Sequence, residues 1–302
     1  MKQPFTDPVR TLEDAIRAGA RYLDQFDLVY GHGTGSSLDE AAWLVLEAFG
    51  LDPSEEPDYS MPADQAGLDR AADYLRRRAE DREPAAYITG RAWFCGLPFI
   101  SDARALVPRS PLAEPIMSGF SDYLDPQGVS RVLDLCTGGG CIAIACSYAF
   151  PTAEIDASDI SADALSLAAE NVAMHEVGDR VHLHRSDLFA GLQGKRYDLI
   201  VSNPPYVDRA DMAALSDEYL REPQLGLAAG DDGLDLVRTM LAEAAAHLNE
   251  GGVFICEVGN SAPALEAAYP DLDFRWLQFS HGGEGVFMLT RDDLSGAAAG
   301  RA

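Results

Sequence analysis

From about residue 110 onward the sequence alternates short apolar runs with longer stretches of helical periodicity, and this alternation constrains the fold more than any other feature. Apolar strands separated by helices, here expected notably at 162–175 and 234–248, are typical of a parallel sheet covered on both faces. The link 280–284 is too short for a crossover helix, so one of the last two strands is expected to run antiparallel. The pattern predicts an α/β fold with strands at 131–135, 154–158, 181–184, 199–202, 253–258, 274–279 and 285–290.

The first 86 residues have the pattern of a helical domain instead. Thr11 stands where an N-cap is expected, and acidic residues follow it in the first turn. Apolar residues then recur with helical spacing, and further helices are expected near 39–49 and at 64–80.

Two short aromatic-rich runs, 92–95 and 98–100, flank Gly96 and predict a β-hairpin, which 106–107 are expected to extend. The Gly- and Ala-rich sequence after Leu294 is expected to be disordered. The domains predicted by these patterns are a helical domain at 1–86, a hairpin linker at 87–109, an α/β domain at 110–294 and a disordered tail at 295–302.

The chain is strongly acidic, with 49 acidic and 23 basic residues and a net charge of −26. Such a charge disfavours nucleic acid, whose binding depends on neutralising phosphates, so no sequence-specific nucleic-acid partner is expected. It would attract a basic protein and speed the encounter. Solubility, or adaptation to a salty cytoplasm, is an equally good explanation of the same charge.

Neither a membrane span nor a metal site is expected. No run of about 18 uncharged apolar residues occurs, and the start Met1–Phe5 lacks a signal-peptide pattern, which favours the cytoplasm. No histidine clusters with His32 at metal-ligand spacing. The odd number of cysteines, without CxxC pairs, favours buried thiols over disulfides or zinc ligands; these residues are Cys95, Cys136, Cys141, Cys146 and Cys256.

A glycine-rich loop follows the first strand of the α/β region. Asp134 lies at the end of that strand, and the loop 136–140 contains three successive glycines. Glycine allows the backbone to approach a ligand where a Cβ atom would clash. Asp159, about 20 residues further on, is well placed to bind ribose hydroxyls. A nucleoside-containing ligand is therefore expected, although a nicotinamide cofactor or a simple tight turn would also fit these residues.

The strand at 197–202 leads into Asn203-Pro204-Pro205-Tyr206. Two prolines fix the backbone and have carbonyl acceptors but no N–H donors. The Asn203 side chain and the Pro204 carbonyl can therefore hold the two protons of a planar NH₂ group, while Tyr206 lies against its flat face. Because an amide nitrogen is a poor nucleophile, orienting it toward a methyl sulfonium, worth roughly 7–11 kcal/mol, is the available means of activation. Acceptors that strengthen as positive charge grows on the nitrogen add to this.

This tetrapeptide beyond a glycine loop resembles the amino-methyltransferases that act on adenine, cytosine or glutamine side chains. Residues 92–96 together with 106–111 narrow the resemblance to the protein glutamine N5-methyltransferases. Within them, Tyr30-Gly31-His32-Gly33-Thr34 and 107–111 are similar to the PrmB branch, which modifies a glutamine of a large-subunit (50S) ribosomal protein, the third in the usual numbering. The resemblance runs from about residue 10 to 294.

The resemblance implies a Rossmann-like, seven-stranded class I fold that uses S-adenosylmethionine and releases S-adenosylhomocysteine. It implies that Asp159 holds the ribose and that Asp187 and Leu188 border the adenine. The family often has glycine where this chain has Cys136. The loop residues implied to contact the cofactor, with Asp134 before them, are Cys136, Thr137, Gly138, Gly139 and Gly140. Those implied to hold the glutamine amide are Asn203, Pro204, Pro205 and Tyr206, with Asn203 also beside the cofactor.

Three residues have two interpretations each. Phe99 resembles a family aromatic that covers the active site, but it could equally be a core residue of the hairpin. Arg109 could contact substrate or cofactor, or pair with Glu114 or another acid. His32 could touch the protein substrate or belong to a loop that connects two helices.

Three rival functions are weighed against modification of a basic ribosomal protein. A DNA adenine methyltransferase shares the tetrapeptide, but it needs base flipping and a basic cleft, which a net charge of −26 disfavours. The release-factor branch differs only in short segments and typically has Ile-Pro-Arg-Pro-Asp-Thr-Glu at the second one. An inactive adaptor that kept the fold would not need Asp134, Asp159 and Asn203 intact.

Overall fold

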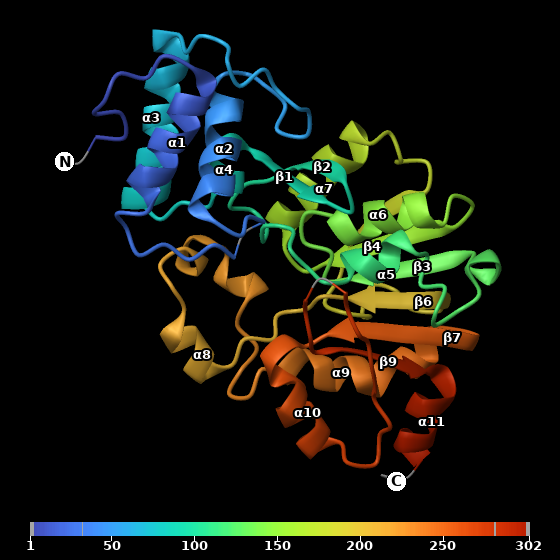
Figure 1. Cartoon of the computed structure of the whole chain (residues 1–302). Coiled ribbons are helices and arrows are strands. Elements are labelled where there is room, and N and C mark those ends of the chain that lie inside the picture. Colours follow the sequence, from blue (N-terminus) through green and yellow to red (C-terminus); the bar gives the residue numbers. More distant parts are fainter. Residues whose placement is uncertain (1–2, 32, 281, 300–302) are drawn as a thin grey trace. The chain divides into compact units, whose positions relative to one another are not determined.

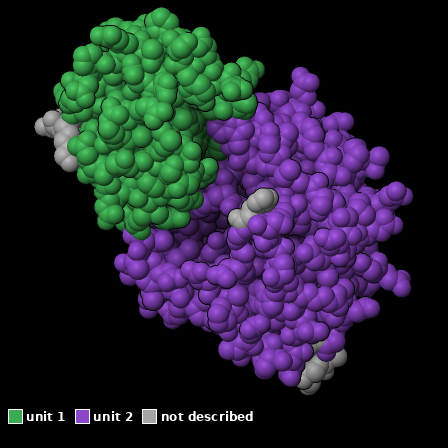
Figure 2. Space-filling view, in the orientation of Figure 1, with its two compact units in different colours: residues 1–92, 101–103, 216–222 green, residues 93–100, 104–215, 223–302 purple. Residues whose placement is uncertain are grey.

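The computed structural model describes residues 3–31, 33–280 and 282–299. The chain divides into two compact units, which Figure 2 shows in different colours. Unit 2 comprises 93–100, 104–215 and 223–302, and unit 1 comprises 1–92, 101–103 and 216–222. The helical unit thus includes a segment, 216–222, that the sequence patterns assign to the α/β domain. Local periodicity carries no signal for such a long-range association.

Unit 1 is built from α1 (Leu12–Leu23), α2 (Ser37–Ala48), α3 (Gln65–Glu80) and the short α4 (Ala85–Thr89). The predicted cap of the first helix is confirmed. The Thr11 hydroxyl accepts from the Asp14 N–H at 3.2 Å, and the Asp14 carboxylate accepts from the Thr11 N–H at 3.2 Å, which together form a capping box. The predicted second and third helices are confirmed to within two residues of their ends, and buried apolar residues of all three longer helices share one core.

A buried cluster of charges explains why 216–222 belongs to unit 1. Arg78 of α3 is 1% exposed and donates from Nε to Glu40 at 2.6 Å and from Nη1 to Glu218 at 3.3 Å. Glu218 also pairs with Arg82 at 3.1 Å and accepts from the Val29 N–H at 3.2 Å. Both carboxylates are 1% exposed, so the cluster excludes water and holds the distant segment on the helices.

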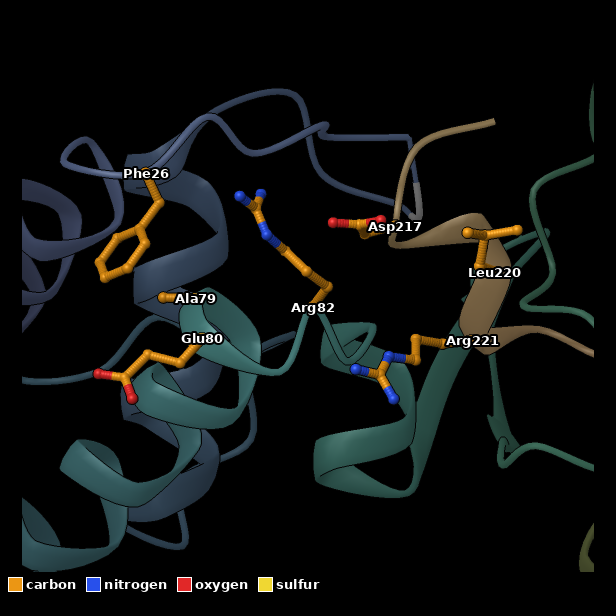
Figure 3. Close-up of a pocket in the computed structure, with 7 residues that line it drawn as sticks. All are labelled: Phe26, Ala79, Glu80, Arg82, Asp217, Leu220 and Arg221. Carbon is orange, nitrogen blue, oxygen red and sulfur yellow. The ribbon is translucent and has the colours of Figure 1, made fainter. Parts of the chain in front are cut away.

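Unit 1 also contains a cavity of about 690 Å³, shown in Figure 3. In that view Phe26, Ala79 and Glu80 lie on one side and the segment that carries Asp217, Leu220 and Arg221 lies on the other. Arg82 projects between them. Leu220 is 50% exposed, which is high for so large an apolar side chain. The segment 216–222 therefore contributes both to the buried charge cluster and to an open pocket.

Unit 2 contains a seven-stranded sheet within the described residues, visible in Figure 1. β9 runs antiparallel to both of its neighbours and the other pairs are parallel, which confirms the predicted fold and the reversed strand near its end. In the last predicted hairpin the first strand is shorter than expected, because β8 covers only Arg275–Trp276 of the predicted 274–279. In order across the sheet the strands are β5 (Val181–Arg185), β4 (Glu154–Asp159), β3 (Arg131–Leu135), β6 (Tyr197–Ser202), β7 (Leu248–Glu257), β9 (Val286–Thr290) and β8 (Arg275–Trp276).

Alternate residues of the strands enter two separate cores, one on each face of the sheet. Val132 and Ile255 belong to one core, and their neighbours Leu133 and Phe254 belong to the other. This is the consequence of the two-residue period of a strand. Three α-helices of unit 2 line the first core or its border: α5 (Ala113–Met117), α6 (Cys141–Ala149) and α7 (Ala162–Met174). Three others line the second core: α9 (Asp235–Glu243), α10 (Ala262–Ala268) and α11 (Arg291–Ala299). α8 (Arg209–Ala214) is exposed.

The predicted hairpin is confirmed as a two-stranded sheet of β1 (Arg91–Phe94) and β2 (Leu97–Ile100). Both turn residues have positive φ, 51° at Cys95 and 74° at Gly96, as in the tight turns that favour hairpins. The prediction that 106–107 extend the hairpin is wrong. Pro108 follows them and has no N–H for a strand ladder.

α11 extends through residues 295–299, into the segment after Leu294 for which disorder is predicted, and that disorder stays a prediction. Thr290 accepts from the Asp293 N–H at 3.2 Å, and Asp293 accepts from the Thr290 N–H at 2.8 Å, so the helix begins with reciprocal capping bonds. The alanines that follow favour the helix more than any other residue type. Residues 300–302 lie outside the described part of the chain.

Candidate functional site

Three parallel strands bring the predicted site residues to one edge of the sheet. In the register of β3, Leu135 pairs with Ser158 of β4 on one side and with Ser202 of β6 on the other. The glycine loop, Asp159 and the Asn203–Tyr206 tetrapeptide therefore all leave the sheet at the carboxyl ends of adjacent strands. Ligands of open α/β sheets bind at this edge.

The glycine loop needs its unusual composition. Cys136, Gly138 and Gly140 have φ values of 64°, 55° and 84°, a region that suits glycine and strains other residues. A Cβ atom on Gly139 would lie 3.3 Å from Leu167 of α7, so the loop packs closely on that helix. Cys136 thus occupies a backbone position that favours glycine, and the loop conformation depends on the positive φ values of Cys136, Gly138 and Gly140.

Asp134 is completely buried directly beneath this loop. Its Oδ2 accepts from the Thr137 hydroxyl at 2.5 Å and from the Ala143 N–H at 3.0 Å, while its Oδ1 has no hydrogen-bond partner among the described residues. Burial raises the pKa of Asp134 to about 7, although these two hydrogen bonds oppose the shift. An unpaired buried carboxylate oxygen is costly, so the site fits a ligand that brings a cationic hydrogen-bond donor.

Asp159 holds the loop from the neighbouring strand. Its Oδ2 accepts from the Gly138 N–H and its Oδ1 accepts from the Ser161 N–H, both at 2.9 Å. Each carboxylate oxygen has a second lone pair, so Asp159 can still accept from ribose hydroxyls. Asp187 is exposed after β5, and Leu188, with φ of 44°, is 9% exposed.

The tetrapeptide keeps its acceptors available. Within the described part of the chain, neither the Asn203 side chain nor the Pro204 carbonyl takes part in a hydrogen bond, and no peptide bond is cis. Tyr206, in contrast, is fixed. Its hydroxyl donates to Glu257 at 2.9 Å, and its backbone carbonyl accepts from the Ser261 hydroxyl at 2.8 Å. The arrangement offers two acceptors beside a fixed aromatic ring, which suits a planar NH₂ group.

Glu257 is a site residue that the sequence reasoning missed. It ends β7, is 5% exposed, and accepts from the Ser110 hydroxyl at 2.5 Å as well as from Tyr206. Burial raises the pKa of Glu257, although the two hydroxyls and the charge of Arg109 act in the opposite direction. The available signal was an acid inside the apolar run 253–258.

Asn171 of α7 was also missed. It is 1% exposed, donates to the Gly139 carbonyl at 2.9 Å, and exchanges hydrogen bonds of 2.8 and 3.2 Å with the backbone of Ile100. It therefore ties the glycine loop to β2. A polar residue on the apolar face of the helix predicted at 162–175 was the signal.

Phe99, Arg109 and His32 differ in outcome. Phe99 is 1% exposed and lies in the core with its ring centroid 4.9 Å from that of His175, so its packing fits the hairpin-core interpretation. Arg109 donates to the Val107 carbonyl at 3.4 Å, and Glu257 is an acid that feels its charge. His32 lies outside the described residues.

The described residues contain no cluster of three or more His, Cys, Asp or Glu side chains that could hold a metal ion. In the same residues no helix is both long and apolar enough to cross a membrane. The five cysteines are free thiols, and burial raises the pKa of each.

The sequence matches the family described as "Methyltransferase small domain" over residues 120–231. It is 48% identical over 296 residues to a ribosomal protein uL3 glutamine methyltransferase of Xanthomonas campestris pv. campestris, which covers 97% of this chain and 96% of that protein. A protein of the same description from Xylella fastidiosa is 50% identical over 299 residues, with 97% and 94% covered. One from Francisella tularensis is 44% identical over 297 residues, again with 97% and 94% covered.

Among solved structures, the hMettl16 catalytic domain in complex with MAT2A 3'UTR hairpin 6 has a TM-score of 0.52. The match covers 78% of this chain and 86% of that chain at 16% identity. At this identity the likeness concerns the fold alone.

Proposed function

Because the chain belongs to the family of ribosomal protein uL3 glutamine methyltransferases, we propose that it transfers a methyl group to the side-chain amide nitrogen (N5) of a glutamine in large-subunit ribosomal protein uL3. Its fold is that of a class I methyltransferase. The observation that carries the proposal is the pair of unengaged acceptors, on Asn203 and Pro204, that follows β6 beside the glycine loop.

The methyl donor is S-adenosylmethionine, which would supply an electrophilic methyl group on a sulfonium and leave as S-adenosylhomocysteine. The unpartnered Oδ1 of Asp134 and the backbone of loop 136–140 would hold its methionine part. Asp159 would accept from the ribose, with Asp187 and Leu188 beside the adenine. The support is that Asp134 and the loop already form a site that lacks a cationic donor.

In the proposed reaction the Asn203 side chain and the Pro204 carbonyl accept hydrogen bonds from the two N–H groups of the glutamine amide. This fixes the plane of the amide and turns its nitrogen toward the methyl group, and Pro205 keeps the two acceptors rigid. The nitrogen would form the N–CH₃ bond as the S–CH₃ bond breaks, and one N–H proton would then pass to water. Tyr206 would lie against the amide. As positive charge grows on the nitrogen, both hydrogen bonds strengthen, so the acceptors stabilise the transition state more than the ground state.

For unit 1 we propose a role in selecting the protein substrate. Gly31, in the sequence that resembles the ribosomal-protein branch, packs on Tyr219 of the segment 216–222, and its neighbour Tyr30 lies near Arg78 of α3. A Cβ atom on Gly31 would overlap the Tyr219 hydroxyl, and the Arg78 guanidinium lies 5.7 Å from the centroid of the Tyr30 ring. Acidic residues outnumber basic ones in this unit, which suits a basic ribosomal protein made in the cytoplasm.

The pocket of Figure 3 gives a way to test this role without deleting the helices, since deletion would leave Glu218 without its arginines. Leu220→Asp should raise the KM for uL3 about tenfold and leave the affinity for S-adenosylmethionine unchanged, because a contact worth one apolar side chain is lost. Leu225→Asp is the matched control, since Leu225 is 61% exposed and does not line the pocket. If Leu220→Asp and Leu225→Asp raise the KM for uL3 equally, the pocket does not contact the protein substrate.

The function itself is tested with labelled S-adenosylmethionine and three purified acceptors, uL3, a peptide chain release factor and duplex DNA. Label should enter one glutamine of uL3, located by mass spectrometry. The relatives support uL3 over the release factor. Label in the release factor or the DNA, and none in uL3, would overturn the proposal.

Asn203→Ala tests the clamp. It should lower kcat by at least about 100-fold, as loss of one group that stabilises developing charge does, with cofactor affinity changed only a few fold by calorimetry. Asn249→Ala is the control, because Asn249 bonds to Asp198 at the opposite end of β6. A parallel loss of cofactor affinity would show that Asn203 serves the nucleoside instead of the amide.

A further inference from the structure

A buried carboxylate lies one strand away from the tetrapeptide. β6 and β7 are parallel neighbours in which Ser202 pairs with Cys256, so Asn203, which directly follows β6, and Glu257, which ends β7, are the next residues in each chain segment. Glu257 is 5% exposed, and both of its oxygens accept from hydroxyls. Both hydroxyl protons, those of Tyr206 and Ser110, are therefore committed to one carboxylate.

The hydrogen bond to Glu257 completes a set of constraints on Tyr206. The Tyr206 ring packs on Gly259, where an added Cβ atom would lie 2.6 Å from it. Its backbone carbonyl is held by Ser261 and would overlap a Cβ atom on Gly233. With both ends of the residue held, the orientation of the ring is determined by groups outside the tetrapeptide.

The same carboxylate acts on a second segment. Ser110 donates to Glu257, and its oxygen accepts from the Leu112 N–H at 3.2 Å, which fixes the turn before α5. Glu257 thus joins the 109–112 segment to Tyr206. The negative charge has a further effect on the ring, because a phenol that donates to a carboxylate becomes richer in electrons. An electron-rich face attracts positive charge more strongly.

We propose that Glu257 is a positioning residue for methyl transfer, which fixes the ring of Tyr206 and makes its face more attractive to the positive charge of the transferring methyl group. The proposal rests on the proposed function. Glu257 does not touch the reacting atoms; it acts through Tyr206. Its loss should therefore lower kcat and leave the affinity for the cofactor unchanged.

The test is a double-mutant cycle of Glu257→Gln and Tyr206→Phe, measured with uL3 and labelled S-adenosylmethionine. Gln keeps the shape and one acceptor and removes the charge, whereas Phe removes the hydroxyl that donates. Each substitution should lower kcat about tenfold with the KM for the cofactor within twofold, and the double variant should be no slower than the slower single variant. Additive losses, or a Glu257→Gln enzyme with the kcat of the wild type, would overturn the proposal.

Two control variants separate positioning from general stability. Asp198→Asn alters another carboxylate of unit 2, which accepts from Ser130, Arg131 and Asn249 at the far end of the sheet, and it should lower the melting temperature but not kcat. Ser110→Ala should change kcat less than Tyr206→Phe does. If Ser110→Ala alone reproduces the loss, Glu257 acts through the 109–112 segment and the proposed route is wrong.

A measurement that needs no activity distinguishes this proposal from the proposed function. With 3-fluorotyrosine at position 206, Glu257→Gln should shift or broaden the ¹⁹F resonance, and Asp198→Asn should not. If the wild type fails to methylate uL3 while the resonance responds, the proposed function fails and the coupling of Glu257 to Tyr206 stands. An unchanged resonance would overturn the coupling itself.

Discussion

Asp134 in unit 2 and Glu218 in unit 1 are both buried carboxylates, exposed by 0% and 1%, but only Glu218 is paired with cations. Burial raises the pKa of Asp134 to about 7. Burial acts in the same direction on Glu218, but backbone N–H groups, including that of Val29, and the charge of Arg78 outweigh it and lower its pKa to about 2.

The difference separates a structural group from a binding group. Glu218 finds all its partners within the chain, so its charge stabilises unit 1 at neutral pH and that contribution is lost as the pH falls below about 4.5 toward 2. Asp134 accepts two hydrogen bonds at Oδ2 but keeps Oδ1 without a partner, so protonation or a cationic ligand would relieve the remaining cost of its burial. A buried carboxylate with an unsatisfied oxygen at a sheet edge therefore indicates a ligand site.

The largest expected effect is on the paired carboxylate. Arg78→Met leaves Glu40 without the Arg78 cation and Glu218 with Arg82 alone, and it should lower the free energy of unfolding by about 3–5 kcal/mol. Urea denaturation followed by circular dichroism measures it. Arg76→Met on the same helix, where the partner Asp73 is exposed, should cost less than about 1 kcal/mol. Similar losses for the two variants would show that the buried ion pairs of Arg78 stabilise the fold no more than an exposed pair does, and the structural role of Glu218 would be wrong.

Asp134 should make the free energy of unfolding fall as the pH rises, whereas Glu218 makes it fall as the pH drops. Because the folded-state pKa of Asp134 is about 7 and its usual value is 3.8, stability is lost as the pH rises through this window. The stability of Asp134→Asn minus that of the wild type should therefore grow by on the order of 1 kcal/mol per pH unit between pH 5 and 7. Denaturant titrations of both proteins, without cofactor, give this difference. A difference that is flat with pH would contradict the raised pKa.

Asp134 should also matter for cofactor binding. Asp134→Asn removes the charge that would face a cationic donor and should weaken S-adenosylmethionine about tenfold or more, since hydrogen bonds to charged groups are worth about 1.5–3 kcal/mol. Calorimetry measures the affinity. Asp156→Asn is the matched control on the next strand, because Asp156 is already paired with Lys195 and should affect stability and not affinity. If both variants bind equally well, the free oxygen of Asp134 does not serve the cofactor.

The smallest expected effect concerns the strained loop beside Asp134. Cys136→Gly should raise the free energy of unfolding by about 1 kcal/mol, because glycine adopts the φ of 64° without strain. Cys136→Ala, which removes the thiol and keeps the Cβ atom, should not stabilise the protein. A thermal shift assay of both variants decides whether the thiol or the backbone is responsible.

The sequence predicted the sheet of unit 2 and the loops at its edge because both depend on local patterns. The apolar alternation predicted β3, β4 and β6, and because these strands were expected to be parallel, the glycine loop and Asn203 were expected at the same edge of the sheet. That β3 lies between β4 and β6 is known from the structure alone. What was missed depends on contacts between distant residues. Ser110 and Glu257 are 147 positions apart, and Arg78 and Glu218 are 140 apart. No periodicity connects such pairs. The hydrogen bonds that Tyr206 and Ser110 donate to Glu257, and the membership of 216–222 in unit 1, could therefore not be derived from the sequence.

Because the segment 216–222 belongs to unit 1, the order of translation affects how that unit is completed. The helices of unit 1 leave the ribosome first, with Arg78 already made and Glu218 still 140 residues from being added. At translation rates of about 5–20 residues per second, that interval lasts roughly 7–28 s. During this time the nascent unit carries arginines without their full set of acids. Completion of its core therefore coincides with synthesis of the segment that follows the tetrapeptide, so maturation of the two units is linked by the order of translation.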